Sequence, residues 1–378
     1  MVALGDRPQL GAIMATPFPR SELPTPALVI DLPIFESNMA AMAEWARAKG
    51  ISLRPHAKTH KSGEIARRQI AAGAVGVCCA KLGEAEALAD DGVHDILITS
   101  PVVSRQAIER LVRLNQKIKR LAVVVDHPDN VDRLAAMLNG QELDVLVDID
   151  TGSHRTGVIS ADATVPLAQR IADANSLHYT GVQFYCGSLQ HVASLAERTS
   201  ALAERTHYLA SVLDQLSAAG LPPEVISGGG TGSFAVDAEL GALTELQPGS
   251  YLFMDRQYLD CEAAGPTFEP SLAIETRVVS ANMAGRVTVD AGLKAMATEA
   301  GPPRVLAGAD PASTYHFMGD EHGMLITPEG ASDPKLDQQV RLLTPHCDPT
   351  VNLYDRYAIC EGGLVVDYWT VTARGRSS

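Results

Sequence analysis

The residues Leu53-Arg54-Pro55-His56-Ala57-Lys58-Thr59-His60-Lys61 stand where a short apolar strand ends and a turn begins. Neighbouring positive charge lowers the pKa of a lysine and frees its lone pair, so Lys58 is a candidate for Schiff-base chemistry. Alternation along an extended segment would point His56, Lys58 and His60 to one side. A solvated basic loop is the other interpretation of the same residues.

Short β-type runs alternate with helix-length segments around this stretch. The eight runs are residues 27–32, 51–53, 75–79, 96–99, 121–125, 145–149, 181–185 and 224–227. Helix-length segments between them include residues 34–49, where Phe35, Met39, Met42 and Trp45 follow helical spacing, and residues 195–219. Eight runs roughly 25 residues apart predict a parallel (β/α)₈ barrel, and a doubly wound open sheet has the same local pattern.

The pattern changes after about residue 260. Helical periodicity fades, and β-type runs follow one another at 272–279, 287–289, 324–327, 340–343, 356–360 and 364–372. Glycine-rich turns separate several of them, which is typical of a mostly antiparallel β domain. We therefore expect a barrel over residues 22–260 and a β domain over residues 261–378, to which residues 1–21 could be joined.

Size and composition narrow the class of protein. A chain of 378 residues exceeds what one hydrophobic core usually organises. The 45 acidic residues outnumber the 31 basic ones, which argues against a nucleic-acid-binding surface. Residues 1–20 lack a signal-peptide pattern, and no run of about 18 apolar residues exists to span a membrane. The six cysteines include adjacent Cys78 and Cys79, which should face opposite ways, and reduced thiols in a cytoplasm are expected.

A glycine cluster follows the last of the eight runs, in the sequence Ser227-Gly228-Gly229-Gly230-Thr231-Gly232-Ser233. Glycines let the backbone approach an anion closely, and exposed N–H groups at Gly229, Gly230 and Thr231 could serve as donors. The cluster predicts a phosphate site at the carboxyl ends of the barrel strands, although a flexible turn has the same composition.

The tripeptide His346-Cys347-Asp348 is a candidate metal site. On an extended segment this spacing puts the imidazole and the carboxylate on one face and Cys347 on the other. The pair could chelate a divalent cation, with waters completing the coordination shell.

Taken together, these motifs resemble the D-threonine aldolase and D-serine dehydratase family, pyridoxal-phosphate enzymes of the alanine-racemase-like fold. The family's lysine motif is close to R-P-H-x-K-T-H-K, which residues 54–61 match. The resemblance continues in order through residues 76–81, 227–233, 248–255, 290–294, 320–323 and 345–350, nearly the whole chain.

The resemblance implies the cofactor and its surroundings. Lys58 would hold pyridoxal 5'-phosphate as an internal aldimine. Arg155 would lie near the cofactor ring and donate to its phenolate oxygen, and Tyr185 would lie beside the ring. Ser250 and Tyr251 would supply further donors to the phosphate.

The resemblance also bears on the metal and the substrate. The aldolase branch carries H-x-D where the related dehydratases carry H-x-C with zinc, so manganese, magnesium or a similar ion is expected at His346 and Asp348. Asp320, together with His322, would orient a metal-bound water or the substrate. The remaining substrate candidates are His56, His191 and Gln190.

We therefore expect a lyase that cleaves D-β-hydroxy amino acids of the D-threonine type to glycine and an aldehyde by a retro-aldol reaction. A D-serine or D-3-hydroxyaspartate dehydratase is the near alternative. An amino-acid racemase, which needs two opposed bases and no metal, and a non-catalytic pyridoxal-phosphate carrier are more distant ones. The fold class also implies a head-to-tail homodimer that acts on small amino acids, with the active site between subunits.

Overall fold

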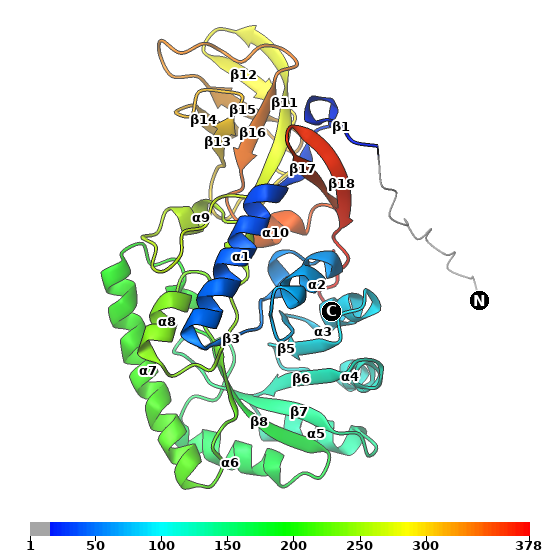
Figure 1. The fold of residues 1–378 in the computed structure, drawn as a ribbon, viewed down its shortest axis with the longest axis vertical. Helices are drawn as coiled ribbons and strands as arrows, with labels where there is room; N and C mark the ends of the chain where they lie inside the picture. The colour runs from blue at the N-terminus through cyan, green and yellow to red at the C-terminus, as the bar shows by residue number, and fades with distance from the viewer. Residues whose placement is uncertain (1–15) are drawn as a thin grey trace, which may run out of the picture.

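Eight parallel strands form the expected (β/α)₈ barrel in the computed structural model, which describes residues 16–378 (Figure 1). The strands are β3 (Ser52–Leu53), β4 (Val77–Cys79), β5 (Asp95–Ile98), β6 (Arg120–Val125), β7 (Leu143–Asp148), β8 (Leu177–Phe184), β9 (Val225–Gly228) and β10 (Glu245–Leu246). β10 pairs with β3 on one side and β9 on the other. A parallel bridge between His56 and Cys78 joins the β3 segment to β4 and closes the ring.

One strand expected in the barrel lies elsewhere. The run that begins at Ala27 forms β2 (Ala27–Asp31), which belongs to the second sheet, so the barrel starts with β3. The eighth barrel strand is instead β10, whose two residues are too few to form a recognisable apolar run. Because β2 is not part of the barrel, the strand that precedes each motif is one number lower in the barrel than the count from the sequence suggested.

Helices cover the outside of the barrel. They are α1 (Leu32–Lys49), α2 (Gly63–Ala71), α3 (Leu82–Asp90), α4 (Arg105–Lys117), α5 (Pro128–Met137), α6 (Ala161–Ala172), α7 (Leu195–Ala218) and α8 (Phe234–Leu240). The spacing predicted α1 correctly: Phe35 and Met42 are fully buried on its inner face. The helix ends at Gly50, whose φ of 67° suits glycine.

The inside of the barrel has an apolar half and a polar half. On β4 to β7 the inward side chains are Cys78, Leu97, Ala122, Val124 and Leu146. Cys79, by contrast, packs in the outer core, so the two cysteines face opposite ways as predicted. All six cysteines are free thiols.

The polar half is a continuous hydrogen-bonded chain of side chains. Arg54 Nε donates to Glu245 at 2.9 Å, and Ser227 Oγ donates to the same carboxylate at 2.6 Å. Gln247 Nε2 donates to Ser227 Oγ at 2.8 Å and to Gln183 Oε1 at 3.4 Å, and Gln183 Nε2 donates to Asp148 at 2.9 Å. Buried polar groups are costly unless they are paired, and this chain pairs them across β3, β10, β9, β8 and β7.

The second sheet is mostly antiparallel, as expected. It contains β1 (Phe18–Pro19), β2, β11 (Leu272–Met283), β12 (Arg286–Val289), β13 (Arg304–Ala307), β14 (Thr314–Phe317), β15 (Gly323–Ile326), β16 (Gln339–Leu343), β17 (Arg356–Glu361) and β18 (Leu364–Thr370). The six predicted runs are all strands, whereas β13 and β14 were not predicted. β2 pairs antiparallel with β11 and parallel with β17.

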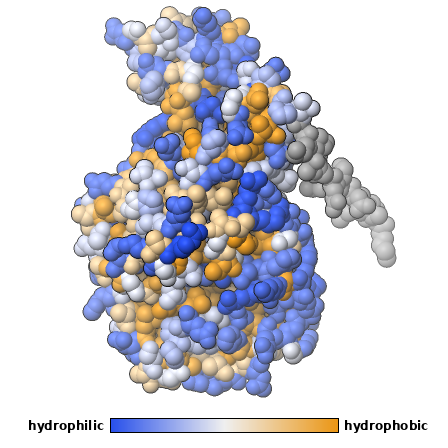
Figure 2. Space-filling model, in the orientation of Figure 1, coloured by the Kyte–Doolittle hydropathy of each residue, from blue (hydrophilic) through white to orange (hydrophobic). Residues whose placement is uncertain are grey.

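The second sheet lies at one end of the barrel, joined through a narrow neck where orange, hydrophobic residues gather (Figures 1 and 2). The short helix α10 (Cys347–Val351) lies in this neck, close to the 3₁₀ turn η2 (Ala57–Thr59) of the lysine segment. None of the helices described between residues 16 and 378 combines the length and the hydropathy that a membrane-spanning helix needs.

Candidate active site

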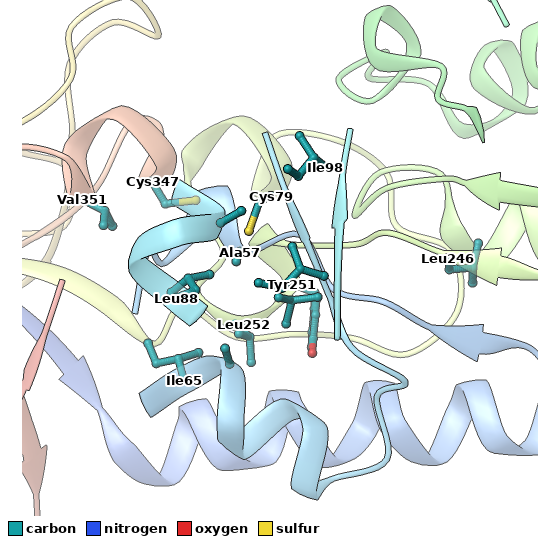
Figure 3. Packing of buried hydrophobic residues seen from close by; sticks show 14 of the residues in the cluster. Ala57, Ile65, Cys79, Leu88, Ile98, Leu246, Tyr251, Leu252, Cys347 and Val351 are labelled. Carbon is teal, nitrogen blue, oxygen red and sulfur yellow. The ribbon is translucent and has the colours of Figure 1, made fainter. Parts of the chain in front are cut away.

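Lys58 lies in η2, just beyond the end of β3. Cys347 and Val351 of α10 pack into the same hydrophobic cluster as Ala57 (Figure 3). With Cys347 buried in that cluster, the next residue, Asp348, lies at the lysine, and its carboxylate forms an ion pair with Lys58 Nζ. Residues that are 290 positions apart therefore meet at the carboxyl end of the barrel strands.

The charge around Lys58 differs from the sequence expectation. Burial is the largest single influence and lowers the pKa of Lys58, but the Asp348 carboxylate, with smaller contributions from Tyr185 and Cys347, raises the pKa above its ordinary value. The same pairing holds the pKa of Asp348 well below its usual range, against the effect of burial. The expectation that neighbouring cations lower the lysine pKa was wrong because it left out a carboxylate from the other end of the chain.

The lysine segment is also not extended, so alternation does not place its histidines. His56 caps η2, its Nε2 lies 3.0 Å from Thr99 Oγ1, and its side chain is buried. His60 is fully buried and its Nδ1 accepts the Ser62 N–H at 3.1 Å. Burial lowers the pKa of His60 to about 4 and that of His56 well below its ordinary value, so both rings are neutral near pH 7.

The other lysines of the motifs are placed differently. Lys61 Nζ is 3.5 Å from the buried carboxylate of Glu84. Its backbone is in the left-handed region with φ of 51°, and its carbonyl accepts the Ala373 N–H. Lys81 is an exposed residue at the start of α3. Lys58 is therefore the lysine of these motifs whose amine lies at the strand ends beside Asp348.

Arg155 and Tyr185 lie beside the lysine, in the loops after β7 and β8. The Arg155 guanidinium lies 5.9 Å from the centre of the Tyr185 ring, and in the part of the chain described it has no carboxylate partner. Burial raises the pKa of Tyr185, and the nearby Lys58 partly offsets that rise. An unpaired guanidinium and a phenol beside an amine form a donor set that fits an anionic aromatic aldehyde such as pyridoxal phosphate.

The glycine cluster lies after β9 and is braced from within the protein. Gly229 has a φ of 68°, which favours glycine. The Gly230 N–H donates to Ser233 Oγ, and the Gly232 N–H donates to the side chain of Gln190, each at 3.0 Å. Gln190, expected at the substrate entrance, is instead buried. Its packing limits the space at Gly230, where a Cβ would lie 2.5 Å from Gln190 Oε1.

The loop after β10 connects the glycine cluster to the lysine segment. The Tyr251 N–H donates to Thr231 Oγ1 at 3.0 Å, while the Tyr251 ring is in the core and its hydroxyl contacts Gln69. The Pro248 carbonyl accepts the His56 N–H at 3.2 Å. A Cβ at Gly249 would lie 2.5 Å from Thr59 Oγ1, so glycine is needed for this close approach.

Thr231, the buried Ser250 and Lys58 thus belong to one connected set of loops, which suits a cofactor with an aldehyde at one end and a phosphate at the other. A cavity of about 160 Å³ lies beside the same loop, lined by residues that include Thr231, Phe234, Met254, Tyr258 and Phe268. Lys58 does not line that cavity.

His346 and Asp348 lie at the start of α10 rather than on an extended segment. His346 has extended backbone angles and precedes the helix, and Asp348 is in its first turn. The two side chains are close enough that His346 helps to lower the pKa of Asp348. Cys347, between them, is fully buried.

The His346 ring has a partner that the sequence did not indicate. Its Nδ1 lies 2.7 Å from Glu299 Oε1, and Nε2 has no hydrogen-bond partner among residues 16–378. An imidazole held by a carboxylate on one nitrogen is the usual arrangement of a metal ligand. Within residues 16–378, no group of three or more His, Cys, Asp or Glu side chains is arranged around a metal position. The residues fit a divalent cation with two protein ligands and waters.

His191 completes the group around Lys58, whereas Asp320 does not reach it. The His191 ring lies 4.5 Å from the Tyr258 ring, and burial, together with His346 and Lys58, lowers its pKa. Asp320 is exposed between β14 and β15, 3.8 Å from Lys294. In the described part of one chain, no hydrogen bond or ion pair joins Asp320 or the neighbouring His322 to Lys58.

Comparison with known proteins agrees with this geometry. Residues 30–257 match the family model of the alanine racemase N-terminal domain, and residues 271–360 match that of a putative serine dehydratase domain. The chain is 40% identical to a D-threonine aldolase of Arthrobacter sp over 95% of each chain. It is 39% identical to a 3-hydroxy-D-aspartate aldolase of Paracoccus denitrificans over 94% of this chain and 93% of the relative.

Solved structures give the same result. The structure of a D-threonine aldolase from Filomicrobium marinum superposes with a TM-score of 0.92 at 39% identity, covering 95% of this chain and 98% of that one. A D-threo-3-hydroxyaspartate dehydratase solved in a metal-free form superposes with a TM-score of 0.82 at 29% identity, covering 93% and 98% of the two chains. The resemblance inferred from the motifs is confirmed.

Proposed function

Because this chain belongs to the D-threonine aldolase and D-serine dehydratase family, we propose that it cleaves D-β-hydroxy amino acids of the D-threonine type to glycine and an aldehyde. Membership of this family, which has the alanine-racemase-like fold, makes the protein an aldolase-type lyase. The proposed cofactors are pyridoxal phosphate and a divalent cation. The observation that carries the proposal is the convergence of Lys58, Asp348 and His346 at one end of the barrel.

The cofactor would be held by residues of four loops. Lys58 would bind its aldehyde, Arg155 and Tyr185 would flank its ring, and the loops at Thr231 and Ser250 would receive its phosphate. When bound, pyridoxal phosphate supplies an electron sink for the electrons of the bond that breaks at Cα. Arg155, which has no carboxylate partner between residues 16 and 378, can donate hydrogen bonds to the cofactor without giving up an ion pair.

The cation would be held by His346 Nε2 and by Asp348, the latter once Lys58 has exchanged this carboxylate for the cofactor. A divalent cation bound there supplies a Lewis acid for the substrate's β-hydroxyl. Imidazole and carboxylate suit manganese, with magnesium as a second candidate. A buried thiol at Cys347, whose pKa burial raises far above its ordinary value, is a poor ligand by comparison.

His191 is the base that we assign to the β-hydroxyl proton. Its pKa is lowered by burial and by the positive groups around it, so the ring is neutral near pH 7 and can accept a proton. Tyr258 holds the ring from one side. His56, neutral and bonded to Thr99, serves in this proposal to fix the start of η2 and therefore the direction of Lys58.

A dehydratase is the second candidate, since relatives with that activity are similar over most of the chain. The two are separated by incubating the holoenzyme with D-threonine, D-serine and D-3-hydroxyaspartate, with and without manganese. An aldolase releases glycine and an aldehyde, whereas a dehydratase releases ammonia and a 2-oxo acid. Ammonia as the main product from all three substrates would overturn the aldolase assignment, and racemised substrate would favour a racemase.

We also propose that the protein is a head-to-tail homodimer in the cytoplasm. Asp320 and His322 are exposed and away from the Lys58 site of their own chain, as residues that serve a second copy would be. Free thiols at all six cysteines suit a reducing compartment. Sedimentation analysis should give a dimer, and a fully active monomer would contradict the assembly.

A further inference from the structure

The segment from Ala297 to Pro302, which lies next to the His346 ring, is held by hydrogen bonds at both of its ends. At its start, the Ala297 N–H donates to Thr350 Oγ1 at 3.1 Å, and that hydroxyl donates to the His346 carbonyl at 2.7 Å. At its end, the Arg256 guanidinium donates to the carbonyls of Ala300 and Pro302. Three of these contacts fix the segment relative to α10 and to α9 (Arg256–Leu259).

Glu299 lies between the two fastened ends and reaches the His346 ring. Its Oε1 is 2.7 Å from His346 Nδ1. An ionised carboxylate can only accept hydrogen bonds, so the proton of a neutral His346 ring is on Nδ1. The lone pair is then on Nε2, the nitrogen that has no partner in the described part of the chain. The Glu299 side chain is half exposed, so its pairing with His346 should contribute little to stability.

We propose that Glu299 is a positioning residue for the divalent cation, which selects the tautomer of His346 that can bind a metal and fixes the direction of its lone pair. This inference rests on the proposed function, because it assigns the cation to His346 and Asp348. Nothing near Glu299 in the sequence suggests the role, since it is 47 residues away from His346. The fastened segment explains how a surface loop can hold the ring in one orientation.

The test measures manganese binding to cofactor-loaded protein by isothermal titration calorimetry, for the wild type and for four variants. Loss of the carboxylate that orients a metal-bound histidine typically costs 10- to 100-fold in affinity, so we expect roughly that increase in Kd for Glu299→Ala. Glu299→Gln keeps an oxygen that can accept from Nδ1, and it should bind manganese more tightly than Glu299→Ala. His346→Ala should abolish stoichiometric binding.

The control is Glu239→Ala, which removes another exposed carboxylate, one paired with Lys49 on the outside of the barrel. It should bind manganese as the wild type does. The absorbance of the cofactor and the urea midpoint should be the same in the Glu299 variants and the wild type.

The outcomes distinguish a failure of the proposed metal site from a failure of the role proposed for Glu299. If the wild type binds no manganese at a single site, or if His346→Ala binds it normally, the metal part of the proposed function is wrong. If the wild type binds manganese and His346→Ala does not, yet Glu299→Ala binds as the wild type does, only the role of Glu299 is overturned.

Discussion

Replacement of Asp148 by asparagine should stabilise the protein at neutral pH. Asp148 lies at the end of β7 with a side chain that is almost completely buried. Burial raises its pKa to about 6, against the effect of hydrogen bonds from Gln183 at 2.9 Å and Thr156 at 2.7 Å. Asparagine can keep both contacts, because its oxygen accepts from Gln183 and its amide donates to Thr156 Oγ.

The expected gain in the free energy of unfolding follows from the linkage between proton binding and folding. The ordinary pKa of this group is 3.8, and each pKa unit corresponds to about 1.36 kcal/mol, so ionising Asp148 in the folded protein costs about 3 kcal/mol at pH 7. A folded-state pKa above the unfolded value gives stability that is fully present below pH 3.8 and is lost as the pH rises through about 6. Asparagine has no such loss, so its advantage over the wild type should grow by about 2 kcal/mol between pH 4 and pH 7.

The assay is urea unfolding followed by circular dichroism at several pH values from 4 to 7.5, for the wild type and Asp148→Asn. Asp132→Asn is the control, because Arg170 lowers the pKa of that exposed carboxyl and the pH trend should be small and of opposite sign. A free-energy difference between Asp148→Asn and the wild type that stays constant across this range would refute the reasoning. Asp148 would then be ionised in the folded protein at no cost.

Three further predictions concern the site and the barrel. Borohydride reduction of the holoenzyme and peptide mapping should find the pyridoxyl group on Lys58, and a label on any other lysine would refute its role. His346→Ala and Asp348→Ala should keep the cofactor absorbance but lose at least 100-fold in aldolase rate, which corresponds to an activation free energy about 2.7 kcal/mol higher. Wild-type enzyme treated with a chelator should show the same loss of rate until manganese is added. An unchanged rate in chelated enzyme would exclude the metal role. Arg54→Met should destabilise the protein by about 3–5 kcal/mol in urea unfolding, because it removes the ion-pair partner of the buried Glu245 carboxylate. Adding Glu245→Gln to this variant should restore part of the lost stability. Equal stability of Arg54→Met and the wild type would contradict this prediction.

The sequence was sufficient for the barrel because periodicity is a local property. Seven of the eight predicted runs are barrel strands, and the helices over residues 32–49 and 195–218 were recognised from spacing or length. The sheet to which a strand belongs depends on its distant partners, so the run at Ala27 was misplaced. β10 was missed because it has only two residues and one of them is Glu245, whose carboxylate can be buried because Arg54 and Ser227 donate to it.

The site was predicted in its members more than in its geometry. Lys58 and Arg155 lie at the same end of the barrel because loops after parallel strands share that end, whereas His346 comes from the second sheet and is placed there by α10. The pKa of Lys58 could not be predicted, since it depends on a carboxylate that only folding brings near. Glu299 was missed for the same reason, as it belongs to no motif and its partner is far along the chain.

The place of β2 inside the second sheet has a consequence for the order of folding. Val29 pairs with Ala273 on one side and with Ala358 on the other, so both neighbours of this strand are synthesised after the barrel. During translation both edges of β2 therefore remain unpaired until the later strands are synthesised, and unpaired strand edges can pair with other chains. A gene fragment that ends after the barrel would keep those edges open permanently. A fragment that begins after the barrel would lack the strand that joins β11 to β17, so neither half of the gene specifies a complete sheet.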